Sequence, residues 1–388
     1  MFSPEARIPL ARPDLCEEDI AEVVSCLKSG WITSGTRAAR LETAFAELLG
    51  AGTHAIAVSS ATSGLELALL AVGVEPGDEV ITSAYTFTAT AEAIYNVGAQ
   101  PVLVDIERGT FNIDPARVAE ALGPRTRAVI PVHIGGHACR MNELIALCRL
   151  RGVALIEDAA HALPTRCGGT LVGALDSDAA VFSFYATKSL TTGEGGMVTT
   201  RDAALARRLR LASHHGIDRA AYAREEEPSG SPWHYDVVCR GFKCNMSDAA
   251  AAIAIHQVER VKRSHERRVT LALRYDEALA DLPLIAPPRE DPCDHGWHLY
   301  LARIDSEAGV SRDGLLCELL KRGIVGGTHF KPLPLMSFWA RVTPSAPGSV
   351  AVAIETWRDV VALPLFSGLT DGEQERVIIA LRDILQTS

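Results

Sequence analysis

The strongest constraint on the fold is a regular alternation of short apolar segments with helical segments, which begins at residue 55. Strands that are apolar throughout must be covered on both faces, and their alternation with helices is typical of a mostly parallel sheet between helical layers. The sequence therefore predicts an α/β fold. The expected strands are 55–59, 79–82, 101–104, 128–132, 154–157 and 181–185, and the expected helices are 61–73, 87–97, 114–122 and 140–151.

The chain is also longer than one hydrophobic core usually supports. With 388 residues it is expected to form two domains. A helix predicted over 248–281 begins alanine-rich and becomes highly charged, as expected of a helix that leaves the first domain. We expect a large domain over 1–260, including an N-terminal arm, and a smaller α+β domain over 261–388. Further expected elements are helices at 17–29, 202–213, 311–321 and 371–385, a strand at 297–303 and a surface loop at 224–232.

Composition excludes several classes of protein. The formal net charge of −10 argues against a nucleic-acid surface, which would be basic. No apolar run approaches the ~18 residues of a membrane span, and the N-terminal segment lacks the basic and then apolar pattern of a signal peptide. The nine cysteines are scattered without a Cys-x-x-Cys motif or a Cys/His array, which suits a reducing compartment. We therefore expect a cytoplasmic protein without metal, nucleic-acid or membrane partners.

The candidate functional residues come directly after the predicted strands, where the ligands of parallel sheets bind. Thr62 and Ser63 belong to a hydroxyl-rich helix start, Ser59-Ser-Ala-Thr-Ser-Gly64, whose N–H groups and helix dipole suit a phosphate. Plain helix capping is the alternative. Tyr85 and Phe87 follow the next strand, and an aromatic ring there either stacks on a planar ligand or packs in the core.

Asp158 and Lys188 carry the strongest chemical signal. Asp158 ends an apolar strand, so its carboxylate needs a partner such as a protonated ring nitrogen; capping of a following helix is the alternative. Lys188 follows the apolar run that begins at Val181 and precedes a loop of small hydroxyl residues and glycines. A lysine at an apolar rim loses its proton readily and forms a Schiff base with an aldehyde. A surface lysine is the alternative.

Together these features describe a pocket for pyridoxal 5′-phosphate (PLP), an aromatic aldehyde with a phosphate tail and a basic ring nitrogen. The lysine would bind the aldehyde, and the aspartate would keep the ring protonated so that it accepts electrons. The helix start, together with Ser183, would hold the phosphate, and the aromatic side chain would cover one face of the ring.

Nine segments, in order along the chain, connect the sequence with a known family. They are 30–35, 76–80, 85–90, 131–133, 157–161, 183–188, 193–196, 245–247 and 329–332. Through them nearly the whole chain resembles the DegT/StrS-like sugar aminotransferases. That resemblance implies the PLP-dependent transferase fold of type I, with a large domain around a mostly parallel sheet and a smaller C-terminal domain.

The resemblance also implies roles for individual residues. Lys188 is the implied Schiff-base lysine and proton shuttle, and Asp158 is the implied partner of the pyridine nitrogen. Phe87 is expected to stack on the ring, and His161 to lie near the ring's O3′ atom or the substrate. The implied phosphate ligands are Thr62, Ser63 and Ser183 of one subunit and Asn245 of its neighbour, so a homodimer with shared active sites is expected. Weaker candidates for substrate contacts are Trp31, Tyr85, Glu194, His329 and Lys331.

The activity implied by the resemblance is transfer of an amino group from an amino acid, most often glutamate, to a keto sugar. The acceptor is expected to be a 4-keto or 3-keto sugar linked to a nucleotide. Aminotransferases for cyclitol ketones or antibiotic precursors, PLP-dependent sugar dehydratases and non-catalytic regulators are the alternatives. His161 stands where many members carry Gln, a form that is similar to the enzyme making UDP-4-amino-4-deoxy-arabinose. Gly135 stands where many members carry a bulkier residue, which predicts a different sugar pocket.

Overall fold

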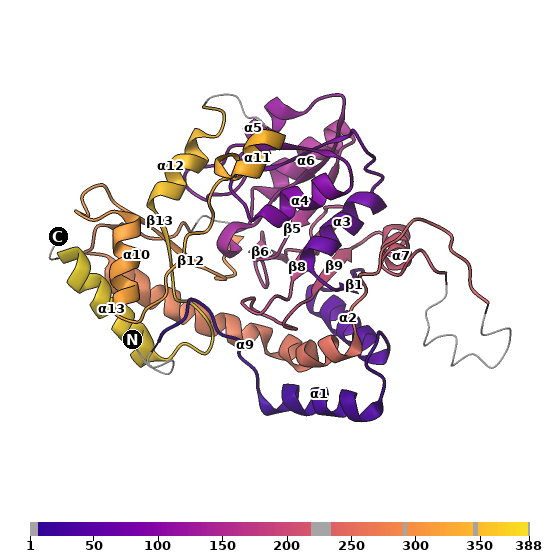
Figure 1. Cartoon of the computed structure of the whole chain (residues 1–388), viewed down its shortest axis with the longest axis horizontal. Helices are drawn as coiled ribbons and strands as arrows, with labels where there is room; N and C mark the ends of the chain where they lie inside the picture. Colours follow the sequence, from indigo (N-terminus) through magenta and orange to yellow (C-terminus); the bar gives the residue numbers. More distant parts are fainter. Residues whose placement is uncertain (1–6, 219–233, 290–292, 344–347, 387–388) are drawn as a thin grey trace.

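The computed structural model describes residues 7–218, 234–289, 293–343 and 348–386 (Figure 1). Its centre is a seven-stranded sheet in the order β1-β9-β8-β5-β4-β2-β3. The strand β9 runs antiparallel to both of its neighbours, and the remaining pairs are parallel, so six strands share one direction. This confirms the predicted α/β fold. The strands are β1 (His54–Val58), β2 (Glu79–Ser83), β3 (Gln100–Val104), β4 (Thr126–Ile130), β5 (Ala154–Asp158), β8 (Ala179–Ser183) and β9 (Gly196–Thr200).

Helices cover both faces of this sheet because its strands are apolar on both sides. In β1, Ile56 and Val58 pack with α3 (Ala61–Ala71), α4 (Thr88–Asn96) and α7 (Ala203–Ala212) on one face. Ala55 and Ala57 face α2 (Thr36–Leu49) and α9 (Asp248–Leu279) on the other. That second face is completed, over β2, β4 and β5, by α5 (Pro115–Ala121) and α6 (Met141–Arg151).

The helix α3 lies close to the sheet, which fixes the position of its N-terminus. Gly64 makes this possible, because a Cβ atom there would lie 2.8 Å from Cγ1 of Val181. Gly196 has the same effect at the start of β9, where a Cβ atom would lie 2.8 Å from the backbone nitrogen of Ala61. The first turn of α3 is therefore held against the ends of β8 and β9.

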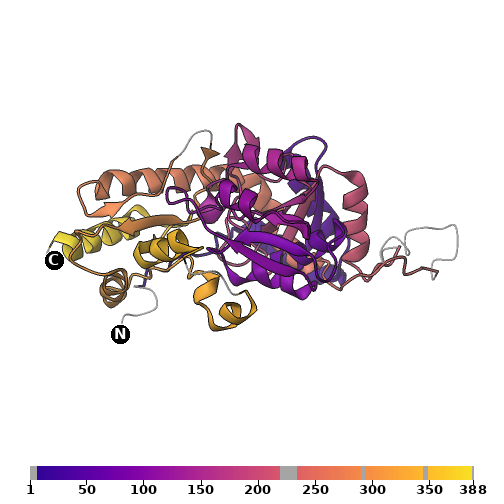
Figure 2. The same ribbon diagram turned by 90° about the horizontal axis from the view of Figure 1, so that it is seen from above.

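The C-terminal part of the chain has its own core. A small sheet, β10-β12-β13, packs with α10 and α13, and these elements lie at the end of the molecule away from β1 (Figures 1 and 2). The boundary predicted near residue 260 falls inside α9, which contacts the first core through Ala254 and Val258 and the second through Leu271 and Tyr275. The elements are β10 (Leu284–Ile285), β12 (Tyr300–Ile304), α10 (Arg312–Lys321), η3 (Leu333–Leu335), α11 (Ser337–Val342), α12 (Ala351–Asp359), β13 (Val360–Leu363) and α13 (Asp371–Gln386).

Several elements were not predicted, among them α2, β9 and β13. The strand β9 is buried along its whole length but is only five residues long and directly follows a glycine-rich loop. The strand predicted at 297–303 begins instead at Tyr300. The residues before Tyr300 form a turn instead, in which Trp297 has φ +50°. In this turn the Gly296 N–H donates to the Gly136 carbonyl, and the Leu299 N–H donates to the Gly135 carbonyl.

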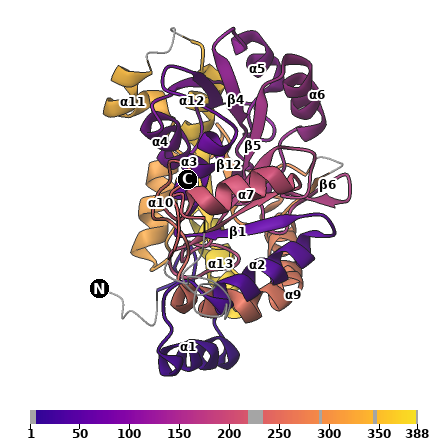
Figure 3. The same cartoon turned by 90° about the vertical axis from the view of Figure 1, so that its right-hand side faces the viewer.

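The helix α1 (Glu17–Ser29) lies at the edge of the molecule and packs against α9 (Figure 3). The predicted surface loop at 224–232 lies outside the described residues. In the described ranges, no helix combines the length and the apolar character needed to cross a membrane.

Candidate active site

A cavity of about 640 Å³ lies at the C-terminal ends of the parallel strands. Its walls come from the segments after β1, β2, β4, β5 and β8, from the N-terminal segment around residue 10, and from two segments of the C-terminal part, around residues 298 and 330. This volume is within the usual range for small-molecule sites. Of the residues predicted from the sequence, the cavity is lined by Thr62, Phe87, Asp158, His161, Ser183, Lys188, Glu194 and His329.

Lys188 enters the cavity from a tight turn after β8. Its backbone N–H donates to the carbonyl of Tyr185 at 2.9 Å, and the side chain is half-buried. Burial lowers the pKa of Lys188 to about 8, and the nearby Asp158 carboxylate only partly opposes that shift. A substantial fraction of this amine is therefore uncharged near neutral pH, as a nucleophile requires.

The lowered pKa predicts how fast cofactor-free protein captures PLP. A group with a pKa of about 8 is roughly a tenth neutral at pH 7 and half neutral at pH 8, so the rate of covalent capture should rise roughly fivefold over that interval. It should then level off above about pH 9. Stopped-flow absorbance measures this rate, and Lys188→Met supplies the background from surface lysines. A rate that still climbs tenfold per pH unit at pH 9–10 would mean an ordinary lysine.

Asp158 is a buried carboxylate with unused acceptor capacity. Its Oδ2 atom accepts from the Thr90 hydroxyl at 2.8 Å, and its Oδ1 atom accepts from the Ala160 N–H at 3.1 Å. Burial nevertheless raises the pKa of Asp158, with these two hydrogen bonds and Lys188 opposing the shift. A cation bound in the cavity would offset the cost of burying this charge.

His161 is held as a neutral imidazole. Burial lowers its pKa well below the usual value, and the charges of Lys188 and His329 lower it further. Its Nδ1 atom accepts from the Gly135 N–H at 3.3 Å, so the ring hydrogen belongs on Nε2. The ring stacks on Phe330 with centroids 5.7 Å apart. His161 is thus a hydrogen-bond donor of fixed orientation.

The start of α3 presents free N–H groups to the cavity through Ala61 and Thr62, and Ser183 faces it from the end of β8. Ser63 differs from its prediction. Its hydroxyl and backbone form a capping box with Ser60, and it does not line the cavity. The capping alternative is therefore observed for Ser60 and Ser63, while Ser60 and Thr62 line the cavity.

Aromatic rings flank the cavity. Phe87 remains 58% exposed, with its ring centroid 6.0 Å from that of Phe330. An exposed phenylalanine on a cavity wall offers a face on which a planar ligand can stack. Tyr85, two residues earlier, is fully buried in the core, and its hydroxyl donates to the carbonyl of His329 at 2.5 Å. Tyr85 thus supports the wall from behind, and the prediction that it contacts substrate is not borne out in this chain.

Other predicted residues lie outside the cavity. Lys331 is exposed and its ammonium lies 5.9 Å from the centroid of the Trp357 ring. Trp31 is bonded to its own loop, where Nε1 donates to the Ser34 carbonyl at 3.2 Å. A Cβ atom at Gly135 would meet Leu301 at 3.2 Å in the core, so Gly135 is a packing position rather than a wall of the sugar pocket.

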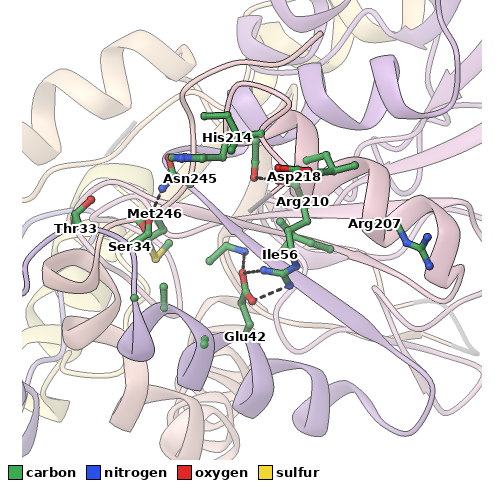
Figure 4. Close-up of a pocket in the computed structure, with 17 residues that line it drawn as sticks. Thr33, Ser34, Glu42, Ile56, Arg207, Arg210, His214, Asp218, Asn245 and Met246 are labelled. Atoms are coloured by element: carbon green, nitrogen blue, oxygen red, sulfur yellow. Dashed lines mark hydrogen bonds and ion pairs between the residues drawn. The ribbon is translucent and has the colours of Figure 1, made fainter. Parts of the chain in front are cut away.

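Asn245 lies in a second cavity, of about 280 Å³, beside the edge strand β1, where it is paired with Val58 (Figure 4). Its Nδ2 atom donates to the Ser34 hydroxyl, and its Oδ1 atom is buried without a hydrogen-bond partner. The neighbouring Asp248 accepts from the N–H groups of Gly35 and Ala38, which fixes the loop beside Asn245 at the start of α2. Asn245 therefore does not reach the first cavity within its own chain.

Several residues that line the first cavity were not predicted, among them Thr90, Phe330 and His298. His298 is only 5% exposed, its ring lies 4.4 Å from that of His161, and its Nδ1 atom has no hydrogen-bond partner. Burial and the positive charges nearby lower its pKa well below the usual value. Thr90 carries a weak signal, since it follows Phe87 by three residues in the same matching segment. His298 carries none, because it belongs to a distant segment that only folding brings to the site.

These residues fit PLP. The buried Asp158 carboxylate can take a protonated ring nitrogen, the start of α3 can take a phosphate, Phe87 can cover the ring, and Lys188 supplies an amine of lowered pKa. A cation would compensate the carboxylate of Asp158, and an anion would compensate the positive end of the α3 dipole. The fold and the site thus define a PLP-dependent enzyme.

Comparison with known proteins gives the family. The chain belongs to the DegT/DnrJ/EryC1/StrS aminotransferase family, whose pattern matches residues 13–382. It is 40% identical over 382 residues to the spore coat polysaccharide biosynthesis protein SpsC of Bacillus subtilis, a match covering 98% of this chain and 97% of that protein. The crystal structure of the aminotransferase TlmJ from Streptoalloteichus hindustanus superposes with a TM-score of 0.88 at 35% identity, over 98% of this chain and 99% of that one.

Cofactor-bound forms of a further relative are known. The PLP form of Spr1654 from Streptococcus pneumoniae has a TM-score of 0.89 and 31% identity, over 98% of this chain and 99% of that one. The form of the same protein with pyridoxamine 5′-phosphate (PMP) has the same TM-score of 0.89. The predicted family, fold and cofactor are therefore confirmed.

Proposed function

We propose that this aminotransferase moves the amino group of glutamate to a keto sugar linked to a nucleoside diphosphate. The observation that carries the proposal is the placement of Lys188, with its pKa lowered to about 8, in one cavity with Asp158. The sugar class is supported by the relative that takes part in spore coat polysaccharide biosynthesis. The polar wall formed by Glu194, His329 and His298 also suits a hydroxyl-rich acceptor.

Each residue then has a chemical task. Bound PLP supplies an aldehyde for the amine and a ring that accepts electrons. Lys188 would hold the cofactor through its amine and would serve as the base for the Cα proton of the donor. Asp158 would hold the ring nitrogen in its protonated form, and His161, a donor through Nε2, would contact the O3′ oxygen or the substrate. Thr62, Ser183 and the start of α3 would bind the phosphate.

The assembly belongs to the same proposal. We place Asn245 at the phosphate of a neighbouring subunit, in a homodimer with shared active sites. The buried, unpartnered Oδ1 atom of Asn245 and its position outside its own chain's first cavity support this. A monomeric mass at micromolar concentration by light scattering would contradict it. The free state of all nine cysteines suits the cytoplasm, where we place the protein.

A spectral titration tests the function. Glutamate added to the PLP-loaded protein should convert the visible absorbance to that of the PMP form, and one nucleotide-linked keto sugar should restore it. The matched comparisons are glutamine in place of glutamate, the same sugar without its nucleotide, and a panel of cyclitol ketones. If only cyclitol ketones restored the visible absorbance, the keto-sugar acceptor would be wrong and the transaminase activity would still stand. If neither glutamate nor glutamine changed the spectrum, the proposal that glutamate is the amino donor would be contradicted.

Lys188 also decides between this proposal and its rivals. Those PLP-dependent sugar dehydratases that resemble this family carry histidine at the lysine position, so an intact lysine favours transamination. A non-catalytic regulator would have no need of an amine whose pKa is lowered beside a buried carboxylate.

A further inference from the structure

A small three-stranded sheet beside the candidate active site brings two cysteines together. It consists of β11 (Cys293–Asp294), β6 (Arg166–Cys167) and β7 (Thr170–Leu171), in that order. The strands β11 and β6 are antiparallel, and Cys293 is paired directly with Cys167. The two residues are 126 positions apart in the sequence, so only the fold makes them neighbours.

The hydrogen-bond pattern of the sheet fixes the kind of pair they form. The Val172 N–H donates to the Thr165 carbonyl at 2.9 Å, so the carbonyl of Thr165 is directed towards the strand that contains β7. Because bonded and non-bonded pairs alternate, Cys167 directs its backbone groups towards β7 and away from β11. Cys167 and Cys293 are therefore a non-hydrogen-bonded pair, for which Cα atoms lie about 4.5 Å apart and side chains approach closely. Disulfides need a Cα separation of about 4.4–6.8 Å.

Both thiols lie on the same face of this sheet. Arg166 and Asp294, the neighbouring pair, are exposed, and alternation along a strand directs the two cysteines to the opposite face. Cys167 and Cys293 are half-buried and line one shared cavity. The Ala138 N–H donates to the Sγ atom of Cys293 at 3.2 Å, which holds that sulfur in place.

We propose that Cys167 and Cys293 form a redox modification site, in which a small-molecule disulfide such as oxidised glutathione converts them to an intrachain disulfide. One thiol loses its proton and attacks the reagent's S–S bond, releasing one molecule of reduced reagent. The second thiol loses its proton and displaces the other half of the reagent. Two electrons pass from the protein to the reagent, one S–S bond is broken and one is formed, and the two protons end on the released thiols.

The cross-link would act on the segment that enters the candidate active site. β11 leads within four residues to His298, which lines the first cavity. The hairpin of β6 and β7 follows β5, which carries Asp158. A disulfide between Cys167 and Cys293 would therefore link the segment that leads to His298 to the hairpin that follows β5. Burial raises the pKa of both thiols, so the exchange is expected to be slow at neutral pH.

Peptide mapping of the full-length protein tests the proposal. After incubation with oxidised glutathione at pH 8.5 and blocking of free thiols, most molecules should yield a peptide that links Cys167 to Cys293, about 2 Da lighter than the two reduced peptides together. Dithiothreitol should abolish it. In Cys167→Ser the link should vanish and Cys293 should carry a glutathione adduct instead. Cys317→Ser, which changes an exposed and distant thiol, should leave the link unchanged.

One competing pair lies nearby. Cys139 lines the same cavity, but it is fully buried and its Sγ atom donates to the Val132 carbonyl at 3.3 Å. Cys139→Ser should therefore keep the link between Cys167 and Cys293. A link between Cys139 and Cys293, or stable glutathione adducts on both Cys167 and Cys293 without any link, would overturn the proposal.

Discussion

Replacing Lys188 with alanine is expected to lower the transamination rate by at least about 10⁴-fold and to leave the fold intact, since the variant loses both the amine that holds the cofactor and the base for the Cα proton. The described residues that line the cavity include histidines but no second lysine. The histidines cannot take over, because burial keeps His161 and His298 neutral and they lack a primary amine. The measurement is a single-turnover assay with glutamate.

The fold should survive because Lys188 contributes little to it. Its pKa lies below the usual value, which means that the folded state disfavours its charge. The cofactor-free variant should therefore melt at the same temperature as the parent protein, or slightly higher. Lys321→Ala, at an exposed lysine paired with Glu318, is the matched control and should keep full activity. Turnover retained by the Lys188 variant would refute the assignment.

Asp158→Asn is expected to lower kcat/KM by roughly 10²–10⁴-fold. Breaking a buried charge pair costs about 3–5 kcal/mol, and each 1.36 kcal/mol corresponds to about a tenfold change in rate. Asparagine keeps the shape of the side chain, and its Oδ1 atom can still accept from the Ala160 N–H. The loss should therefore come from the charge that keeps the ring nitrogen protonated.

A second readout separates this role from a structural one. The absorbance of the bound cofactor should change its pH dependence in Asp158→Asn, while the circular dichroism spectrum stays the same. Thr90→Val removes one hydrogen bond to the carboxylate and keeps the charge, so it should cost only about 10–100-fold. If the asparagine variant were as active as the parent protein, Asp158 would not be the partner of the ring.

The sequence was sufficient wherever a residue's position follows from the strand that precedes it. Thr62, Phe87 and Lys188 each follow a strand of a mostly parallel sheet, and Asp158 ends another; those strands share one direction. Parallel strands end at the same edge, so the topology alone brings these residues into one cavity.

The local sequence pattern did not predict which of two neighbouring candidate residues in a loop faces the cavity. Phe87 faces the cavity while Tyr85 packs in the core, and Thr62 faces it while Ser63 caps α3. Neither pair is distinguishable by composition. Which side chain faces the ligand depends on the backbone path, which is set by contacts such as that of the Tyr85 hydroxyl with the segment at His329.

The sequence by itself determined the fold class, the family and the two groups that carry the chemistry, because strand–helix alternation and short motifs are local properties of the chain. Only the tertiary structure decided that His298 joins His161, that Asn245 lies outside its own chain's first cavity, and that Cys167 lies opposite Cys293. These relations join segments that are about 125–210 residues apart, and no local periodicity specifies the packing that brings such segments together.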